Sequence, residues 1–201
     1  MRYLLFLLLI AACRAPGEVM TSPLVGAVKT RLESTRAKAP RLVLDDEPTG
    51  PGGARGVCYD NHIRVMGEGQ GLGLNYYIAH ELVHWYTHDS PYEGLPLFIE
   101  EGLADWIACD LTGGLNSRIA ENEQIGTLSI DPRHLWLDNA EFRQLPRDEY
   151  VDLTRAGFEI VRRLGLPRLR ELLRDNAAPF DYLRAAGVIP DTPDVDWPTL
   201  D

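Results

Sequence analysis

Apolar residues recur at helical spacing near the start of this chain, and they predict an amphipathic helix over residues 23–38. Ser22 and Pro23 are typical of a helix start, as the N-cap and the first helical residue. Pro40 predicts that the helix has ended by that point. The apolar positions that define its inner face are Leu24, Val25, Val28 and Leu32.

The rest of the chain divides into short strands followed by helices. Residues 41–44 predict a strand, and residues 57–59 and 63–65 predict a hairpin around Asp60 and Asn61. Glycine and proline mark loops at 45–56 and 67–73, residues 115–147 are mixed, and the tail from Pro190 reads as irregular. Further helices are predicted over residues 74–87, 96–111, 147–164, 167–175 and 179–186.

This order of elements predicts a small α+β domain. A short sheet should pack beside the helix of residues 74–87, and a helical lobe should follow from about residue 115. We expect any ligand site to lie in the cleft between these two parts.

The segment that ends at Cys13 carries the pattern of an export signal. Met1 and Arg2 form a short positive start, and residues 3–12 are almost wholly apolar but too few to span a bilayer. Small residues then precede Cys13, as in the lipobox of bacterial lipoproteins, which predicts lipidation of Cys13 and a cell-envelope protein held by acyl chains alone. Cleavage near Ala12 or Ala15, giving a secreted or periplasmic soluble protein, and an incidental Cys13 remain the alternatives.

Composition places the chain beyond Cys13 in the globular class, with enough length for one domain with its own core. The whole chain is 45% hydrophobic and 25% charged, with a formal net charge of −10, which argues against nucleic acid as a partner. Cys58 and Cys109 could pair in an oxidising compartment, although two free thiols are the simpler interpretation. The pattern leaves the oligomeric state open.

The sequence His80-Glu81-Leu82-Val83-His84 carries the chemistry. Histidines at i and i+4 project from one face of a helix, which is the spacing that two imidazoles need to bind one Zn²⁺. Glu81 lies beside the first ligand, where a carboxylate can take the proton of a water bound to the ion. This H-E-x-x-H pattern is typical of metalloproteases.

A second stretch, Phe98-Ile99-Glu100-Glu101-Gly102-Leu103-Ala104-Asp105, completes a resemblance. Together, HELVH and FIEEGLADW resemble the gluzincin (peptidase MA-like) zinc metallopeptidases over roughly residues 54–107, with Phe98 where that family often has tryptophan. The resemblance implies a zincin-like catalytic domain over residues 41–201, after an N-terminal segment of residues 14–40. It also implies that Glu101, on the helix after the one that carries His84, is the third zinc ligand, with Glu100 as its rival. Asp105 would support a ligand histidine.

Hydrolysis also needs a donor for the charge that develops on the scissile carbonyl oxygen. Tyr150 is the first candidate for this donor, and His134 and Arg155 are the alternatives. His88 extends the histidine series, but the residues around it do not follow the metzincin pattern, so we expect a surface position. We expect His62, in the hairpin turn, to face solvent.

These patterns predict a zinc-dependent peptidase in which Glu81 activates a metal-bound water and the substrate is a peptide or protein. The sheet edge at residues 63–66 could bind the substrate backbone as an added strand. An exported zinc-binding scaffold without hydrolytic activity is the alternative. The sequence does not indicate a natural substrate or a cleavage preference.

Overall fold

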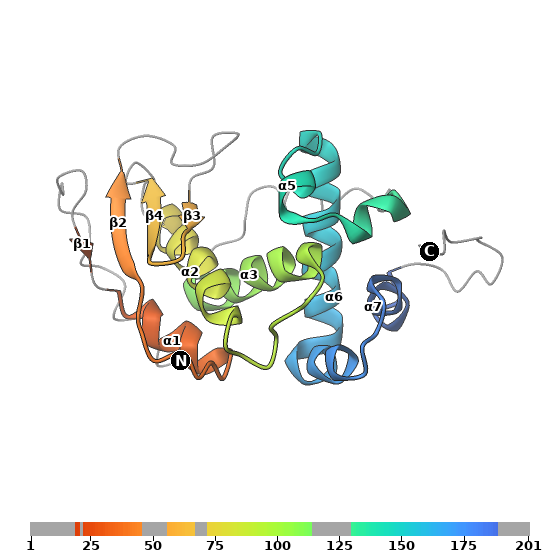
Figure 1. The fold of residues 1–201 in the computed structure, drawn as a ribbon, viewed down its shortest axis with the longest axis horizontal. Coiled ribbons are helices and arrows are strands. Elements are labelled where there is room, and N and C mark those ends of the chain that lie inside the picture. The colour runs from red at the N-terminus through yellow and green to blue at the C-terminus, as the bar shows by residue number, and fades with distance from the viewer. Residues whose placement is uncertain (1–18, 21, 46–55, 67–71, 114–129, 189–201) are drawn as a thin grey trace.

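The computed structural model describes residues 19–20, 22–45, 56–66, 72–113 and 130–188. Over these residues the protein is α+β and mostly helical, as the order of elements predicts (Figure 1). The predicted export signal with Cys13, most of the loops at 45–56 and 67–73, and the tail from Pro190 lie outside the described residues. Among the described residues, no helix is both long and apolar enough to cross a membrane.

The described strands form one mixed sheet in the order β1-β2-β4-β3. β2 and β4 run parallel, whereas β1 pairs with β2 and β3 pairs with β4 in antiparallel fashion, so the predicted hairpin is confirmed. Because β4 has a neighbour on each side, residues 63–66 do not form a free edge, and that expectation is wrong. The edge strand on this side of the described sheet is β3. The strands are β1 (Val19–Met20), β2 (Arg41–Asp45), β3 (Gly56–Cys58) and β4 (His62–Met66).

The first helix, α1 (Leu24–Arg31), is shorter than the predicted residues 23–38. Glu33 has φ 51°, in the left-handed region that ends a helix. The next residues then bond elsewhere, since the Thr35 amide donates to the Asp89 carbonyl at 2.9 Å. This long-range bond explains why helical periodicity alone overestimated the length of α1.

Two long helices, α2 (Leu72–Thr87) and α3 (Leu97–Thr112), form the centre of the protein, close to their predicted bounds. α3 ends at Gly113, whose φ of 66° gives the left-handed C-cap that glycine favours. α2 packs on β3 and β4 and also on α3, while α3 packs on α6 on its other side (Figure 1). The sheet therefore lies at one end of the molecule and the helical lobe at the other.

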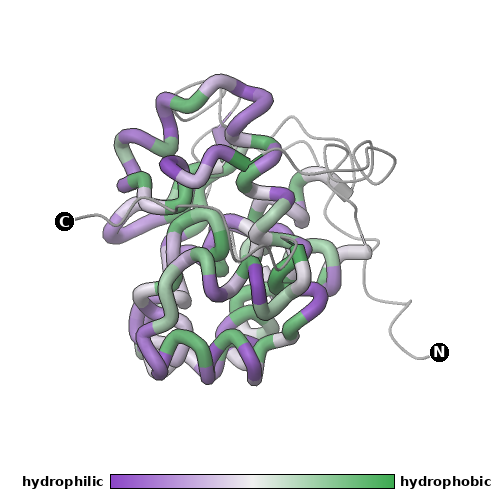
Figure 2. Tube along the Cα trace, turned by 90° about the vertical axis from the view of Figure 1, so that its right-hand side faces the viewer, coloured by the Kyte–Doolittle hydropathy of each residue, from purple (hydrophilic) through white to green (hydrophobic). Residues whose placement is uncertain are grey.

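The helical lobe follows residue 130. The predicted helices over residues 147–164 and 167–175 are confirmed as the two halves of α6, which a kink separates at Gly165, where φ is 69° and ψ is 165°. Figure 2 shows hydrophobic and hydrophilic residues interspersed along the coiled segments, and the residues of this lobe are accordingly partly buried and partly exposed. The elements are the 3-10 helix η2 (Pro132–Trp136), α5 (Asn139–Phe142), α6 (Arg147–Arg174) and α7 (Pro179–Ala185).

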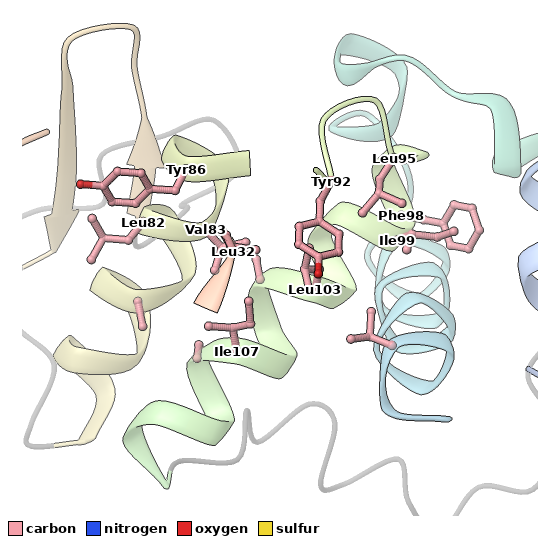
Figure 3. Packing of buried hydrophobic residues seen from close by; sticks show 14 of the residues in the cluster. Leu32, Leu82, Val83, Tyr86, Tyr92, Leu95, Phe98, Ile99, Leu103 and Ile107 are labelled. Atoms are coloured by element: carbon pink, nitrogen blue, oxygen red, sulfur yellow. The ribbon is translucent and has the colours of Figure 1, made fainter. Parts of the chain in front are cut away.

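One hydrophobic cluster runs through both parts of the protein. It includes Val83 of α2 and Ile107 of α3, which are fully buried (Figure 3). Two consecutive fully buried aromatic residues of α2, Trp85 and Tyr86, belong to the same cluster. α2 and α3 are therefore held by core packing on several sides, and their polar side chains have fixed positions relative to one another.

Candidate metal centre

Three side chains from α2 and α3 converge at one point. The Nε2 atoms of His80 and His84 are 3.2 Å apart. The Glu101 carboxylate faces both, with Oε2 at 3.4 Å from His80 Nε2 and Oε1 at 3.6 Å from His84 Nε2. Among the described residues, this is the group whose geometry could hold a metal ion.

These separations match the edges of a tetrahedral site. Ligand atoms about 2.0–2.1 Å from one ion, at tetrahedral angles, are about 3.3–3.4 Å from one another. The three observed separations of 3.2, 3.4 and 3.6 Å bracket that value. Two imidazole nitrogens and a carboxylate oxygen also form a donor set that suits a divalent cation of the zinc type. The residues present therefore fit such an ion.

Each imidazole is oriented by a different carboxylate through its other nitrogen. His80 Nδ1 lies 2.9 Å from Asp105 Oδ1, and His84 Nδ1 lies 3.0 Å from Glu100 Oε1. When both Nδ1–H groups donate, both Nε2 atoms present lone pairs toward Glu101. With both imidazoles neutral, a cation held by these three atoms would offset the repulsion between the lone pairs and the carboxylate. Glu100 thus orients His84, and Glu101 is the carboxylate that faces both Nε2 atoms.

The charged groups of this cluster shift one another's pKa values. Burial alone would lower the pKa of His84, but Glu101 and Glu100 outweigh it and raise that pKa to about 9. Burial is likewise outweighed at His80, where Asp105 and Glu101 raise the pKa well above its ordinary value. Burial raises the pKa of Glu101, yet the two histidines lower it to about 2. In the absence of a metal, the two imidazoles therefore carry protons that a cation would have to displace.

Glu81 follows His80 on α2, and its side chain lies against β3, the edge strand of the described sheet. A Cβ built on Gly56 of β3 would lie 2.5 Å from Glu81 Oε1, so the strand passes directly over this carboxylate. Glu81 is 7% exposed, and burial is the main cause that raises its pKa, while the charges of His80 and His84 act in the opposite direction. A carboxylate with a raised pKa is suited to accept and then release a proton.

Tyr150, at the start of α6, reaches the same centre from the helical lobe. Its hydroxyl donates to Glu101 Oε2 at 3.3 Å, and its ring packs edge-on against Phe142 at 5.1 Å between centroids. The charge of Glu101 and burial raise the pKa of Tyr150 well above its ordinary value, so the hydroxyl keeps its proton. The candidate site is therefore formed by side chains of α2 and α3 together with Tyr150 of α6.

The two alternatives to Tyr150 are His134 and Arg155. His134 Nδ1 lies 3.3 Å from Glu149 Oε2, in a pocket of about 260 Å³ that none of the three candidate ligands lines. Arg155 is half-buried on α6 near Asp152, where its charge opposes the effect of burial on the carboxyl pKa. The pocket is lined by Ile130, Asp131, Arg133, His134, Glu149 and Leu153.

Among the described residues, His62, His88, Cys58 and Cys109 take the simpler positions that the sequence suggests. His88 is exposed and lies 3.8 Å from Glu93. His62 is partly exposed and stacks on Tyr59 at the hairpin turn, with ring centroids 4.7 Å apart. Cys58 and Cys109 do not form a disulfide, and burial is the main cause that raises the pKa of Cys58 to about 12.

Sequence reasoning missed two supporting side chains. Tyr76, one turn before His80, donates its hydroxyl to Asp105, and Glu100 was weighed as a ligand and not as a partner of His84. The i, i+4 spacing between Tyr76 and His80 was a signal for the first, because such residues share a helix face. The role of Glu100 as a partner of His84 depends on the direction of its side chain, which residue spacing alone does not give.

Comparisons of this chain with protein-family models, with curated proteins and with solved structures found no match.

Proposed function

We propose that this protein is a zinc-dependent peptide hydrolase with a zincin-like fold, of the gluzincin kind that its two motifs resemble. The proposal depends chiefly on one observation. His80, His84 and Glu101 present three ligand atoms at separations of 3.2–3.6 Å, which is the spacing of three corners of a tetrahedron around a Zn²⁺-sized ion. Glu81 and Tyr150 lie around this group from different elements and supply the two further roles that hydrolysis needs.

A bound Zn²⁺ would polarise the scissile carbonyl and lower the pKa of a water at the site. Glu81 accepts the proton of the attacking water and passes it to the nitrogen of the leaving amine. Its burial and raised pKa favour both steps, because the carboxyl group can hold the proton between them. Tyr150 keeps its proton and can donate a hydrogen bond to the oxygen on which negative charge develops.

The position of β3 supports a peptide as the proposed substrate. Glu81 lies against Gly56 of this strand, and β3 is the edge strand of the described sheet. An extended peptide that pairs with β3 would therefore pass close to the general base. Export and anchoring through Cys13 belong to the same proposal, and they are supported by the sequence up to Cys13 alone.

The test combines metal analysis with peptide cleavage on the purified mature protein. We expect about one equivalent of zinc in the wild type and cleavage of a broad peptide library, whereas His84→Ala should lose both. Glu81→Gln should keep the zinc and lose cleavage, because it removes only the proton acceptor. Glu171→Gln, an exposed change on α6, serves as the matched control and should alter neither.

Two results would count against the proposal. Zinc binding without cleavage of any peptide by the wild type would favour the scaffold alternative. Full cleavage by Glu81→Gln would show that another group activates the water, and the role given to Glu81 would be wrong.

A further inference from the structure

Tyr76 and His80 share one acceptor atom. The Tyr76 hydroxyl and His80 Nδ1 both bond to Oδ1 of Asp105, the histidine at 2.9 Å. Tyr76 and Asp105 are 6% and 2% exposed, so both bonds are shielded from water. We propose that Tyr76 is a positioning residue, which holds the metal-binding face of His80 through Asp105; this inference rests on the metal centre of the proposed function.

The geometry of α2 makes this arrangement possible. Tyr76 precedes His80 by one helical turn, a rise of about 5.4–6 Å, so both side chains lean toward the same part of α3. Their ring centroids are 6.3 Å apart, with an angle of 32° between the planes. Two donors that approach one oxygen from neighbouring turns fix both the position and the rotation of the Asp105 carboxylate.

Removal of the Tyr76 hydroxyl would leave this buried carboxylate with one donor fewer. A buried acceptor that loses a partner is costly, and its side chain gains freedom to rotate toward other donors. The bond to His80 Nδ1 would then be less well fixed, and so would the direction of the His80 Nε2 lone pair. The effect on the metal would pass through Asp105, without any contact between Tyr76 and the ion.

The other ligand histidine is held differently. His84 Nδ1 bonds to Glu100, whose side chain is 21% exposed, whereas the Asp105 side chain is 2% exposed. The Tyr76 hydroxyl donates to Asp105, the carboxylate that bonds to His80 Nδ1. A change at Tyr76 should therefore affect His80 selectively, and this selectivity separates a positioning role from a general loss of stability.

The test uses Tyr76→Phe in the mature protein, with Tyr86→Phe as the matched control. Tyr86 is also a buried tyrosine of α2, 1% exposed, and it follows the metal-binding motif in the sequence, whereas Tyr76 precedes it. Zinc affinity is measured by competition with a chromophoric chelator. Loss of a direct carboxylate partner costs about 10–100-fold in metal affinity, so we expect a smaller loss of about 3–10-fold for Tyr76→Phe and none for Tyr86→Phe.

A spectroscopic readout accompanies the affinity. In the zinc-loaded protein, ¹⁵N-edited NMR should show a shifted and faster-exchanging Nδ1–H signal for His80 in Tyr76→Phe, with that of His84 unchanged. A double-mutant cycle with Asp105→Asn covers the case in which Tyr76→Phe lowers stability. If Tyr76 acts through Asp105, its substitution should cause little further loss of affinity in the Asp105→Asn background.

Wild-type zinc affinity and an unchanged His80 signal in Tyr76→Phe would overturn the inference, and so would an equal loss in Tyr86→Phe or full additivity in the cycle. These outcomes are distinct from a failure of the proposed function. A wild type that binds zinc with the expected dependence on Tyr76, but cleaves no peptide, would refute hydrolysis and leave the role of Tyr76 intact. A wild type without zinc affinity would refute both.

Discussion

Gly102 of α3 and Gly157 of α6 meet where the two helices cross with their backbones in contact. A Cβ on Gly102 would lie 2.1 Å from the carbonyl carbon of Gly157, and one on Gly157 would lie 1.9 Å from the Phe98 carbonyl oxygen. The crossing directly follows Glu101 in the sequence, and Tyr150 precedes Gly157 by about two helical turns. The absence of side chains at this crossing therefore brings the Tyr150 hydroxyl within reach of Glu101.

We expect Gly157→Ala to destabilise the protein by about 3 kcal/mol or more, at the upper end of the usual cost of overpacking, because the new methyl group meets backbone that cannot rotate away. Metal affinity and activity should fall as well where the variant still folds, since α6 must move away from α3. Chemical denaturation measures the stability. Gly26→Ala, in α1 with open space around it, is the control and should be neutral or stabilising by up to about 1 kcal/mol. Equal stability of Gly157→Ala and the wild type would contradict the close crossing.

The helices that bear the site could be predicted from sequence because each combines a periodic apolar face with a clear end. Gly113 ends α3 and Gly165 breaks α6, as their positions after apolar runs predict. α1 was predicted too long because a backbone bond between Thr35 and Asp89, far apart in sequence, overrides local periodicity. The edge of the sheet was misassigned for a related reason, since strand order depends on the parallel pairing of β2 with β4, which no local pattern encodes.

The candidate site shows the same division between local and long-range information. The placement of His80 and His84 follows from helix geometry alone, and the structure brings them within 3.2 Å of each other. The choice between Glu100 and Glu101 depends on how α3 is rotated against α2, which spacing does not fix. Tyr150 lies 49 residues beyond Glu101 in the sequence, and only the packing of α6 on α3 brings the two side chains together.

Gly56 offers a way to displace Glu81, the proposed general base, without changing the proposed metal ligands. We expect Gly56→Ala to fold with a loss of stability of about 1–3 kcal/mol, because the clashing atoms are Cγ, Cδ and Oε1 of the Glu81 side chain and not backbone. The Glu81 carboxylate must move, so kcat should fall by about 10–100-fold, within the contribution that a positioned base makes. Zinc content should stay at the wild-type level.

Peptide cleavage and metal analysis of the same preparation test this expectation. Gly73→Ala, on α2 with nothing within 4 Å of the added Cβ, is the matched control and should keep full activity. Unchanged kcat in Gly56→Ala would mean that Glu81 tolerates displacement, which would argue against its role as the base.

Tyr150→Phe should separate transition-state stabilisation from binding. The variant keeps the ring that packs against Phe142 and loses only the hydroxyl that bonds to Glu101. We expect kcat to fall by about 100-fold, as for the loss of one oxyanion donor, with KM within about twofold of the wild type. Steady-state kinetics on one peptide measure both constants. His134→Gln should leave both unchanged, and a larger loss for that variant than for Tyr150→Phe would favour His134 as the donor.

The stability of the metal-free protein should depend on pH through the ion pairs of the candidate site. The pKa of His84 is raised from 6.5 to about 9, so its stabilising charge is fully present below pH 6.5 and is lost as the pH rises through 9. The pKa of Glu101 is lowered from 4.5 to about 2, so the same pairs are intact above pH 4.5 and are lost as the pH falls toward 2. This cluster therefore favours the folded state most between pH 4.5 and 6.5.

Thermal unfolding in the presence of a chelator should accordingly show Tm falling between pH 6.5 and 9, by about 5 °C or more, since each kcal/mol corresponds to about 2–4 °C for a chain of this size. Zinc should reverse the trend, because the ion replaces the two imidazole protons and binds more tightly as these protons become easier to remove. The increase in Tm caused by zinc should thus grow with pH over the same range.

Glu101→Gln should flatten the metal-free profile, since it removes the charge that raises the pKa of His84 most, whereas His62→Ala at the hairpin turn should not. A metal-free Tm that rises from pH 6.5 to 9 would indicate that the two imidazoles are neutral in the absence of metal, contrary to the raised pKa values that the neighbouring carboxylates give them.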